Sequence, residues 1–417
     1  MGARVVFLGD DFTGASDSLS TYARNGWAAR LRIAPPDSAD GGTEALDALG
    51  IPTDLRSLDV AQALAEVDRL WPAIRAENPQ ILHFKVCSTF DSGPGIGSIG
   101  AVARDLSARF SPDVIAVLGG QPSLGRYCAF GTLFARGPDG AVHRIDRHPV
   151  MARHPVTPMT EADLARHLAA QGLDGLCKIT LAMLDDPAAM RAALGAGPVL
   201  FDATEAGHQD RIAEALASAG GRQLLIGASS VAEVLTRQAG TGTSPAALPA
   251  PPSDRVLIFA GSRSPNTRAQ VREARSLRAV PVDRTALLSG RTAGAVRAMI
   301  AEGAPVLLHL NPEEDYRLGP GDMADASADL IAAILDGVAV GHLGLAGGDT
   351  SSRICHRLGF EALDFETDLG AGVCICTATH ARRDRNGMRI MLKGGQMGSA
   401  DLFDRFAARA ASLSAPA

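Results

Sequence analysis

The sequence predicts an α/β fold built from two α/β domains with mainly parallel sheets, and three observations support this. The chain has 417 residues, which is too long for one ordinary core. Short continuous apolar runs, typical of strands covered on both faces, alternate with helical stretches. Residues 239–254 are rich in Pro, Gly, Ser and Thr and lack apolar periodicity, which is typical of a linker, and we place that linker at 241–254. We therefore expect one domain at 1–240 and another at 255–417.

Each predicted strand runs into a loop rich in glycine and small polar residues. The predicted strands span residues 4–8, 81–86, 113–118, 199–201 and 224–226 in the N-terminal half, and 256–260, 343–346 and 390–393 in the C-terminal half. Ligands of such folds bind beyond the carboxyl ends of the strands, where these loops lie. If the loop edges of the two domains face one another, the active site lies in the cleft between them.

Composition excludes several classes of partner. Hydrophobic residues make up 46% of the chain and charged residues 21%, as in ordinary globular proteins. The net charge of −6 gives no electrostatic reason to expect nucleic acid. No apolar run is long enough to cross a bilayer, and Met1–Gly9 lacks the basic region and cleavage site of a signal peptide. We expect a cytoplasmic protein with no membrane partner.

The cysteine spacing allows two interpretations, a metal site or buried free thiols. Cys374 and Cys376 form a Cys-x-Cys inside an apolar stretch, and on a strand both side chains would face the same side. Buried free thiols are the more common outcome for such a pair. We therefore assign no residue to a protein metal site.

Two adjacent aspartates follow the first predicted strand. Asp10 and Asp11 allow two interpretations. One aspartate can cap the following helix by accepting hydrogen bonds from its free N–H groups. The pair exceeds that need, and the alternative is that one is a general base for a substrate hydroxyl while the other binds substrate or positions Mg²⁺. The spacing alone does not say which aspartate is the base.

Lysine is rare in this chain, and one lysine stands inside an apolar strand. The lysines are Lys85, Lys178 and Lys393. Of the 40 lysines and arginines together, all the others are arginines. Lys85 in an apolar strand is costly unless it is paired or functional. The mixture of cation, hydroxyl and carboxylate groups around it suits a polyhydroxy carboxylate. The candidate substrate-binding residues are Thr13, Ser88, Thr89, Asp91, Ser92, Arg126 and His154, although His154 is also consistent with a structural turn.

Three loops of the C-terminal half predict a phosphate site. They follow strands and precede helices, so glycines and helix N-termini would offer backbone N–H groups to phosphate. Ser262 or Ser264 and Thr350 would add hydroxyl donors, and Lys393 ends the last predicted strand directly before Gly394-Gly395. One such loop alone is usually only a tight turn. Neither Gly-x-Gly-x-x-Gly nor a Walker A motif occurs, which argues against an NAD-dependent oxidoreductase.

Five ordered motifs together resemble the four-carbon acid sugar kinase family over nearly the whole chain. They are Gly9-Asp10-Asp11-Phe12-Thr13-Gly14-Ala15, the segment Phe84–Ser92, the segment Arg153–Thr160, Gly347-Gly348-Asp349-Thr350-Ser351 and Lys393-Gly394-Gly395-Gln396-Met397-Gly398. The resemblance implies an N-terminal sugar-acid-binding domain, a C-terminal nucleotide-binding domain, and ATP with Mg²⁺. It implies ATP contacts from Ser264, Gly347, Gly348, Asp349, Thr350, Lys393, Gly395 and Gly398, and Ser262 is a further candidate from its place in the same loop as Ser264.

The departures from the family pattern bear on metal and substrate. Asp349 is shorter than the family's Glu, which weakens any metal contact through that carboxylate. Asp91 stands where kinases of simple aldonates such as threonate or erythronate carry an arginine, so the chain resembles the branch that phosphorylates 3-oxo acids such as 3-oxo-tetronate. Gly93–Gly100 and Gly125–Cys128 are similar to a subgroup acting on the branched 3-oxo-isoapionate.

The reaction implied is in-line transfer of a phosphoryl group from ATP to a terminal hydroxyl. Asp10 or Asp11 would accept the hydroxyl proton, and Lys85 would neutralise negative charge. The alternatives are a kinase of a simple aldonate and a non-catalytic sugar-acid-binding regulator, which would leave Lys393 and the C-terminal glycine loops without a purpose. A homodimer is compatible with the sequence but is not indicated by it.

Overall fold

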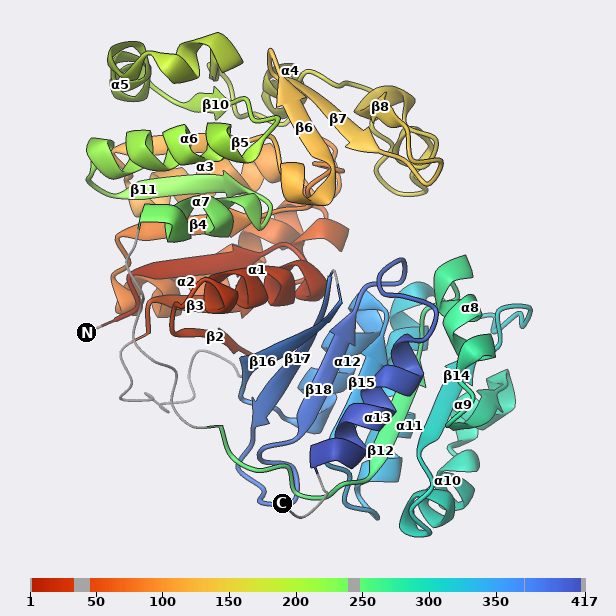
Figure 1. Cartoon of the computed structure of the whole chain (residues 1–417). Coiled ribbons are helices and arrows are strands. Elements are labelled where there is room, and N and C mark those ends of the chain that lie inside the picture. Colours follow the sequence, from red (N-terminus) through yellow and green to blue (C-terminus); the bar gives the residue numbers. More distant parts are fainter. Residues whose placement is uncertain (1, 34–45, 239–247, 371, 414–417) are drawn as a thin grey trace. The chain divides into compact units, whose positions relative to one another are not determined.

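The computed structural model describes residues 2–33, 46–238, 248–370 and 372–413, which form two compact units (Figure 1). The first unit comprises Met1–Ala29 and Pro36–Pro245, and the second comprises Arg30–Pro35 and Ala246–Ala417. Residues 241–247 of the predicted linker lie outside the described residues. Within the described ranges, no helix combines the length and the apolar character that crossing a bilayer requires.

The first unit is built on a parallel sheet with the strand order β3-β1-β4-β11-β5-β10-β9. Its strands are β1 (Val5–Gly9), β3 (Ala48–Pro52), β4 (Ile81–Lys85), β5 (Val114–Leu118), β9 (Cys177–Ile179), β10 (Val199–Phe201) and β11 (Gln223–Gly227). Every residue of β1 and of β11 is buried, as expected for strands covered on both faces.

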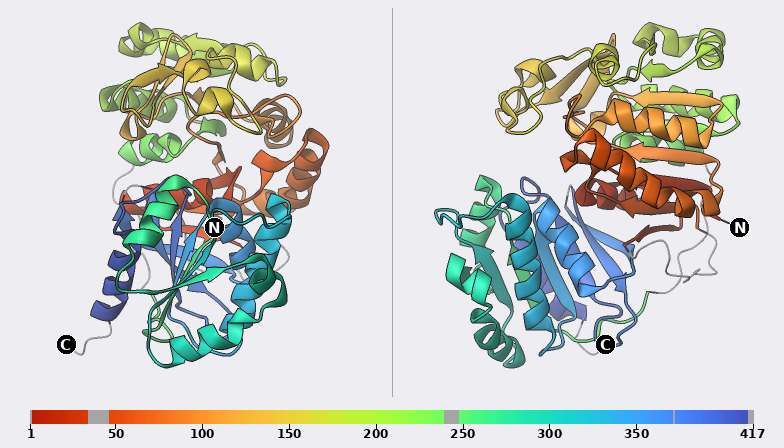
Figure 2. Two further views of the ribbon diagram at one scale, coloured as in Figure 1. Left: turned by 90° about the vertical axis from the view of Figure 1, so that its right-hand side faces the viewer. Right: turned by 180° about the vertical axis from the view of Figure 1, so that it is seen from behind.

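Helices cover both faces of this sheet. Helices α1, α6 and α7 pack together on one face, and α2 and α3 pack on the other (Figures 1 and 2). Their bounds are α1 (Phe12–Arg24), α2 (Val60–Glu77), α3 (Ile99–Phe110), α6 (Ala206–Ala219) and α7 (Ser230–Gln238), with α4 (Leu164–Ala169) and α5 (Pro187–Ala196) completing the unit. Aliphatic and aromatic side chains from α2, α3 and α4 and from the strands they cover form an apolar core cluster of the unit.

A small antiparallel sheet was not predicted. It consists of β6 (Arg126–Ala129), β7 (Thr132–Arg136) and β8 (Val142–Arg144). The chain enters it through the 3₁₀ helix η2 (Pro122–Leu124), which follows β5. Arg126, one of the predicted substrate-binding residues, stands at the start of β6.

The second unit has a mixed sheet with the strand order β13-β14-β12-β15-β18-β17-β16-β2. The first five strands are parallel, and β17, β16 and β2 are antiparallel to their neighbours. Their bounds are β12 (Val256–Ala260), β13 (Arg278–Val282), β14 (Val306–Leu310), β15 (His342–Ala346), β16 (Ala362–Gly370), β17 (Val373–Thr379), β18 (Arg389–Lys393) and β2 (Ala29–Arg32), whose residues from Arg30 onward belong to this unit.

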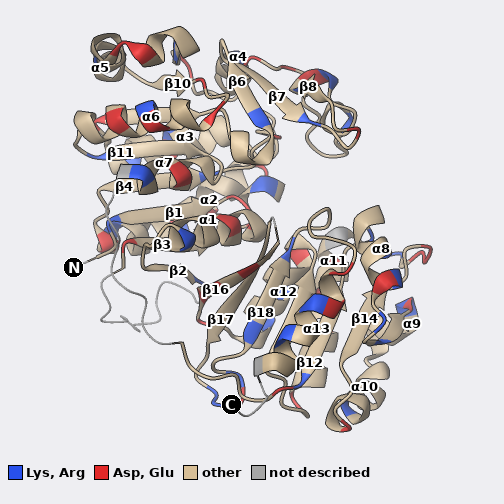
Figure 3. Ribbon diagram, in the orientation of Figure 1, with Lys and Arg blue, Asp and Glu red and all other residues tan. Residues whose placement is uncertain are grey.

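Helices again lie on both faces. Helices α8 and α13 pack on one face, and α9, α10, α11 and α12 lie on the other (Figures 1 and 2). Their bounds are α8 (Pro265–Glu273), α9 (Arg284–Ser289), α10 (Thr292–Ala301), α11 (Pro320–Leu335), α12 (Gly348–Leu358) and α13 (Leu402–Leu413). Cys374 and Cys376 are buried on β17 with their sulfur atoms 3.8 Å apart, as free thiols. Acidic and basic residues are interspersed over both units (Figure 3).

Candidate functional site

The carboxyl edge of the first unit brings the predicted N-terminal residues together. Gly9 at the end of β1 pairs with Pro52 of β3 and with Lys85 of β4, so the three strands end level with one another. Asp10 and Asp11 follow β1, and Lys85 closes β4. The loop after β3 continues into the 3₁₀ helix η1 (Leu55–Ser57), which carries Arg56.

Asp11 caps helix α1. One carboxylate oxygen accepts a hydrogen bond from the Gly14 N–H at 2.7 Å, and the other accepts from the Thr13 hydroxyl at 3.1 Å. The capping interpretation therefore holds for this residue. It does not use all of the carboxylate, since the Asp11 side chain remains 22% exposed and also accepts from Arg56 at 3.0 Å.

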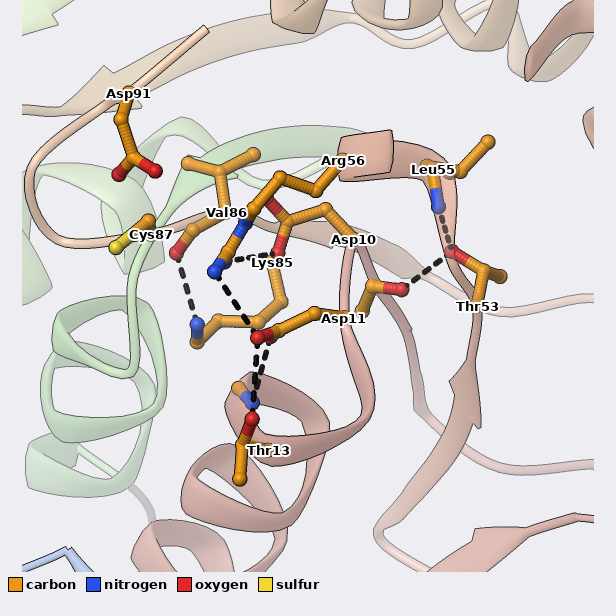
Figure 4. A network of polar contacts seen from close by, with 12 residues as sticks. Asp10, Asp11, Thr13, Thr53, Leu55, Arg56, Lys85, Val86, Cys87 and Asp91 are labelled. Atoms are coloured by element: carbon orange, nitrogen blue, oxygen red, sulfur yellow. Dashed lines mark hydrogen bonds and ion pairs between the residues drawn. The ribbon is translucent and has the colours of Figure 1, made fainter. Parts of the chain in front are cut away.

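Arg56 was not predicted from the sequence. Its guanidinium binds both oxygens of Asp10, at 2.8 Å and 3.1 Å, while its remaining terminal nitrogen binds Asp11 (Figure 4). The two-pronged contact matches the planar fork of arginine to one carboxylate. A signal was present, because Ala48–Ile51 is a short apolar run followed by a polar loop, as in the strands that were recognised. That strand is only five residues long and ends in proline.

The two aspartates differ in their electrostatics. Burial raises the pKa of Asp10 above its usual value, and Arg56 opposes this only in part. Burial also acts to raise the pKa of Asp11, but the nearby Arg56, Lys85 and Gly14 N–H outweigh it and lower that pKa below its usual value. Asp11 is therefore the better-stabilised anion and the more exposed carboxylate, with 22% against 6% for the Asp10 side chain.

Lys85 is buried, with 3% of its surface exposed. Its ammonium donates to the Val86 carbonyl at 2.8 Å, and among the described residues it has no carboxylate within ion-pair distance (Figure 4). It lies against the start of α1, since a Cβ placed on Gly14 would stand 2.6 Å from the Lys85 nitrogen. A buried ammonium with unused N–H groups beside two carboxylates is expensive to maintain and is well placed to receive an anion.

The loop after β4 is held in one conformation by polar contacts. The Thr89 hydroxyl donates to Asp91 at 2.5 Å and lies 3.0 Å from the Cys87 sulfur. Phe90 adopts a left-handed backbone with φ of 54°, which a bulky residue rarely takes. The Ser92 hydroxyl stabilises this turn by donating to the Phe90 carbonyl at 2.9 Å. Ser88 is half-buried in the same loop.

A cavity of about 550 Å³ opens beside this loop within the first unit. One wall is formed by Ser92 and the Gly93–Ile96 segment that the sequence singled out. The lining also includes His167 and Gln171, whose side chains lie 2.9 Å from the Ser92 hydroxyl. The loop that carries Asp91 is thus continuous with the rim of this cavity, whose lining combines polar and apolar side chains.

Arg126 and His154 have different environments. The Arg126 guanidinium donates to the Leu124 carbonyl at 2.9 Å, and its Nε is buried with no hydrogen-bond partner among the described residues. Burial lowers the pKa of Arg126, although the Cys87 thiol nearby opposes this. His154 accepts hydrogen bonds from the backbone and hydroxyl of Thr157 at 3.1 Å and 3.0 Å, as a turn residue does. Arg126 is therefore the stronger candidate for binding a carboxylate.

The predicted phosphate loops gather at the carboxyl edge of the second unit. Ala346 of β15 pairs with Ala260 of β12 on one side and with Lys393 of β18 on the other, so the loops that follow these strands are neighbours. Gly347 occupies the N-cap position of α12 with φ of 124°, a conformation that favours glycine. Because it has no side chain, it makes no capping hydrogen bond to the helix. The N-cap position of α12 therefore supplies no side-chain acceptor, and a helix start of this kind favours an anion.

The loop after β18 packs across the loop after β12. A Cβ on Gly395 would stand 2.6 Å from the Ser262 hydroxyl, and one on Gly261 would stand 2.7 Å from Thr350. Ser264 caps α8 by accepting from the Thr267 N–H at 3.1 Å, and its hydroxyl also donates to the Gly395 carbonyl. Small residues are therefore needed in these loops because larger side chains would collide with the neighbouring loop.

Lys393 is fully buried. Its ammonium donates to the Thr267 hydroxyl and to the Gln270 side-chain oxygen, each at 2.8 Å, and lies 3.5 Å from the Gly395 carbonyl. Burial lowers its pKa to about 8. The contacts indicate that Lys393 fixes α8 and the Gly395 loop, and contributes positive charge beneath them. Among the other predicted residues, Gly348, Asp349 and Thr350 form the first turn of α12, and Gly398 has φ of 85°.

Two family models match successive parts of the chain. A model described as a sugar-binding N-terminal domain matches residues 5–235, and one described as a nucleotide-binding C-terminal domain matches residues 257–403. A 3-oxo-isoapionate kinase from Paraburkholderia graminis is 31% identical, over 96% of this chain and 93% of its own length. A 3-oxo-tetronate kinase from Methylobacterium radiotolerans is also 31% identical, over 95% of this chain and 97% of its own.

Solved structures share the fold. A protein from Salmonella typhimurium LT2, described as a tRNA synthase, superposes with a TM-score of 0.81 at 26% identity, over 97% of this chain and 98% of its own. A Haemophilus influenzae protein gives a TM-score of 0.76 at 22% identity, over 97% and 99% of the two chains. The second likeness concerns the fold alone.

Proposed function

Because the chain belongs to the four-carbon acid sugar kinase family, and is therefore a phosphotransferase, we propose that it phosphorylates the terminal hydroxyl of a small 3-oxo sugar acid. We assign the acid to residues 1–240 and ATP to residues 255–417. The observation that carries the proposal is Lys85, a buried ammonium with no carboxylate partner among the described residues, beside Asp10 and Asp11.

The proton of the acceptor hydroxyl would go to Asp11. This carboxylate is exposed enough to contact a substrate and is held ionised by Arg56 and Lys85. Asp10 has both oxygens engaged by Arg56, so we assign it to positioning that guanidinium. Lys85 would bind the transferring phosphoryl group or the substrate as negative charge develops. Positioning and charge stabilisation supply most of the rate gain in phosphoryl transfer. For transfer to occur, the acceptor hydroxyl must approach the γ-phosphoryl group of ATP in line with the bond that breaks.

The nucleotide phosphates would bind the loops after β12, β15 and β18. The support is the glycine at the N-cap of α12, which supplies no side-chain acceptor, and the close packing of Gly395 on Ser262. We propose Mg²⁺ as the companion of ATP. Among the described residues no group of three or more His, Cys, Asp or Glu side chains could hold a metal ion, which fits an ion that arrives on the phosphates and keeps its waters. When bound, it would neutralise phosphate charge.

The acid itself would be a 3-oxo acid. Asp91 accepts from Thr89 and stands as a hydrogen-bond acceptor where an aldonate kinase would carry a guanidinium. The unpaired Nε of Arg126 offers a site for the substrate carboxylate. The cavity of about 550 Å³ next to Ser92 leaves room for a branched carbon skeleton such as that of 3-oxo-isoapionate. The kinase of that acid is among the similar proteins.

The test compares kcat/KM for 3-oxo-isoapionate, 3-oxo-tetronate, threonate and erythronate with MgATP. We expect a 3-oxo acid to be preferred. A non-oxidised aldonate preferred by more than about tenfold, which is about 1.4 kcal/mol of transition-state discrimination, would refute the choice of acid and leave the kinase assignment intact. A chain that releases no ADP with any acid would refute the proposed reaction.

A further inference from the structure

A second cavity lies in the second unit, beside the phosphate loops, and has a volume of about 240 Å³. Its walls come from α8 and from the end of β14 with the segment after it. Ser262 and Thr267, which belong to the phosphate-loop cluster, form one end. Val271, Leu310 and Pro312 give the rest an apolar lining. An apolar slot that adjoins a phosphate site suits the base of a nucleotide, because the two parts of the ligand then fall on matching surfaces.

The slot is preformed. The segment after β14 is fixed by Tyr316, whose hydroxyl accepts from the Asn311 N–H at 2.8 Å and donates to the Val282 carbonyl. Arg268 of α8 forms an ion pair with Glu313 at 3.1 Å, which joins the two walls. Both walls are therefore tied to the fold independently of any ligand, and binding there would not first require ordering of a loop.

His309 supplies the polar group of the slot. It lies in β14 level with Ala260 of β12, at the same edge as the phosphate loops. Its Nδ1 lies 3.3 Å from the Leu310 carbonyl, which can only accept, so Nδ1 carries the proton. Burial lowers the pKa of His309, so the ring is neutral at physiological pH. Its Nε2 is then an acceptor, and no donor from the described residues occupies it.

We propose that this cavity binds the adenine base of ATP and that His309 Nε2 accepts a hydrogen bond from the 6-amino group. The inference rests on the proposed function and extends it to base selection. A base with a 6-oxo group, such as hypoxanthine or guanine, would put a second acceptor against Nε2 and leave both groups without a donor. Sites built around one such hydrogen bond discriminate more strongly than sites that only exclude by size.

Calorimetric titration of the full chain with ATP, ITP and inorganic tripolyphosphate, each with Mg²⁺, tests the proposal. ITP differs from ATP in carrying 6-oxo for 6-amino. We expect the wild-type chain to bind ATP at least about tenfold more tightly than ITP. His309→Leu should bring that ratio close to one and leave tripolyphosphate affinity unchanged. An ATP-to-ITP ratio that survives in His309→Leu would overturn the assignment.

A second variant tests the slot without touching the histidine. Val271→Trp should fill the slot and weaken ATP binding while tripolyphosphate still binds, whereas Leu288→Trp, at a half-exposed position on α9, should change neither. Unchanged ATP affinity in Val271→Trp would overturn the base site alone. A wild-type chain that binds none of the three ligands would overturn the base site together with the nucleotide half of the proposed function. ATP binding that depends on the slot supports it even if no sugar acid is phosphorylated.

Discussion

The two candidate sites occupy the same place on similar sheets but handle charge in opposite ways. In the first unit, charged side chains are concentrated at the sheet edge, where Arg56 holds Asp10 and Asp11 and Lys85 stands beside them. In the second unit, the edge is made of glycines and hydroxyls, and the lysine is withdrawn beneath it to bind Thr267 and Gln270.

The difference follows from what each edge has to do. Backbone N–H groups and a helix N-terminus bind phosphate without moving a proton. They therefore suit the phosphates of ATP, which the protein must hold but need not deprotonate. An acceptor hydroxyl must lose a proton during transfer, which requires a titratable base with a fixed environment. We expect substitutions in the first unit to affect turnover and those in the second to affect nucleotide affinity.

The largest expected effect comes from removing the buried ammonium. Lys85→Met should lower kcat by about 10³-fold or more, because it takes away a preorganised charge aimed at the reacting group. Turnover is measured as acid-dependent ADP release. Lys178→Met is the matched control, because Lys178 pairs with Asp163 and is 32% exposed, and it should retain activity. Near-normal activity in Lys85→Met would refute its assigned role.

The second-largest loss of turnover is expected from substitutions of Asp10 and Asp11. Asp11→Asn should lower kcat by about 10²-fold or more, since a general base contributes about 10²–10⁴-fold. Asp10→Asn should cost less, because it changes the support of Arg56 and leaves the base in place. Steady-state kinetics of the two variants, with circular dichroism as a check on folding, decides the matter. The reverse order would exchange the two roles, and no effect from either would reduce the pair to a helix cap.

In the second unit, Gly395→Val should raise KM for ATP by about tenfold or more and leave KM for the acid nearly unchanged. A branched side chain there would collide with Ser262 and push the loop away from the phosphates. Gly294→Val is the control, because a Cβ at that exposed position of α10 meets no other atom within 4 Å. Equal changes in both KM values would remove this loop from the nucleotide site.

The smallest effect is a pH dependence. Burial lowers the pKa of Lys393 to about 8, so its charge is present below that pH and is lost as the pH rises through it. Phosphate affinity should fall with that charge. We expect KM for ATP to rise several-fold between pH 7 and pH 9, with little change in KM for the acid. Lys393→Met should have a high KM for ATP at both pH values, and a pH effect that persists in it would have another origin.

Much of this arrangement could be predicted from the sequence because the signals were local. Continuous apolar strands followed by glycine and aspartate located most of the sheet edge, and the strand at Val256–Ala260 was predicted with its observed bounds. The apolar run at Ala48–Ile51 was a local sign of β3, but the role of Arg56 depends on β3 pairing beside β1, a contact between residues distant in the sequence. His309 was missed because the segment Val306–Leu310 has the pattern of an ordinary core strand, and only the tertiary structure shows that the histidine lines a cavity. The inward turn of Lys393 toward α8 likewise depends on tertiary packing.

One measurement tests the division of labour most directly. ATP with Mg²⁺ is titrated by calorimetry into the wild-type chain and into Lys85→Met, and acid-dependent ADP release is measured on the same two preparations. We predict equal affinity for ATP in both, together with turnover only in the wild-type chain. Loss of ATP binding in Lys85→Met, or turnover that survives in it, would contradict the assignment of the chemistry to the first unit and of the nucleotide to the second.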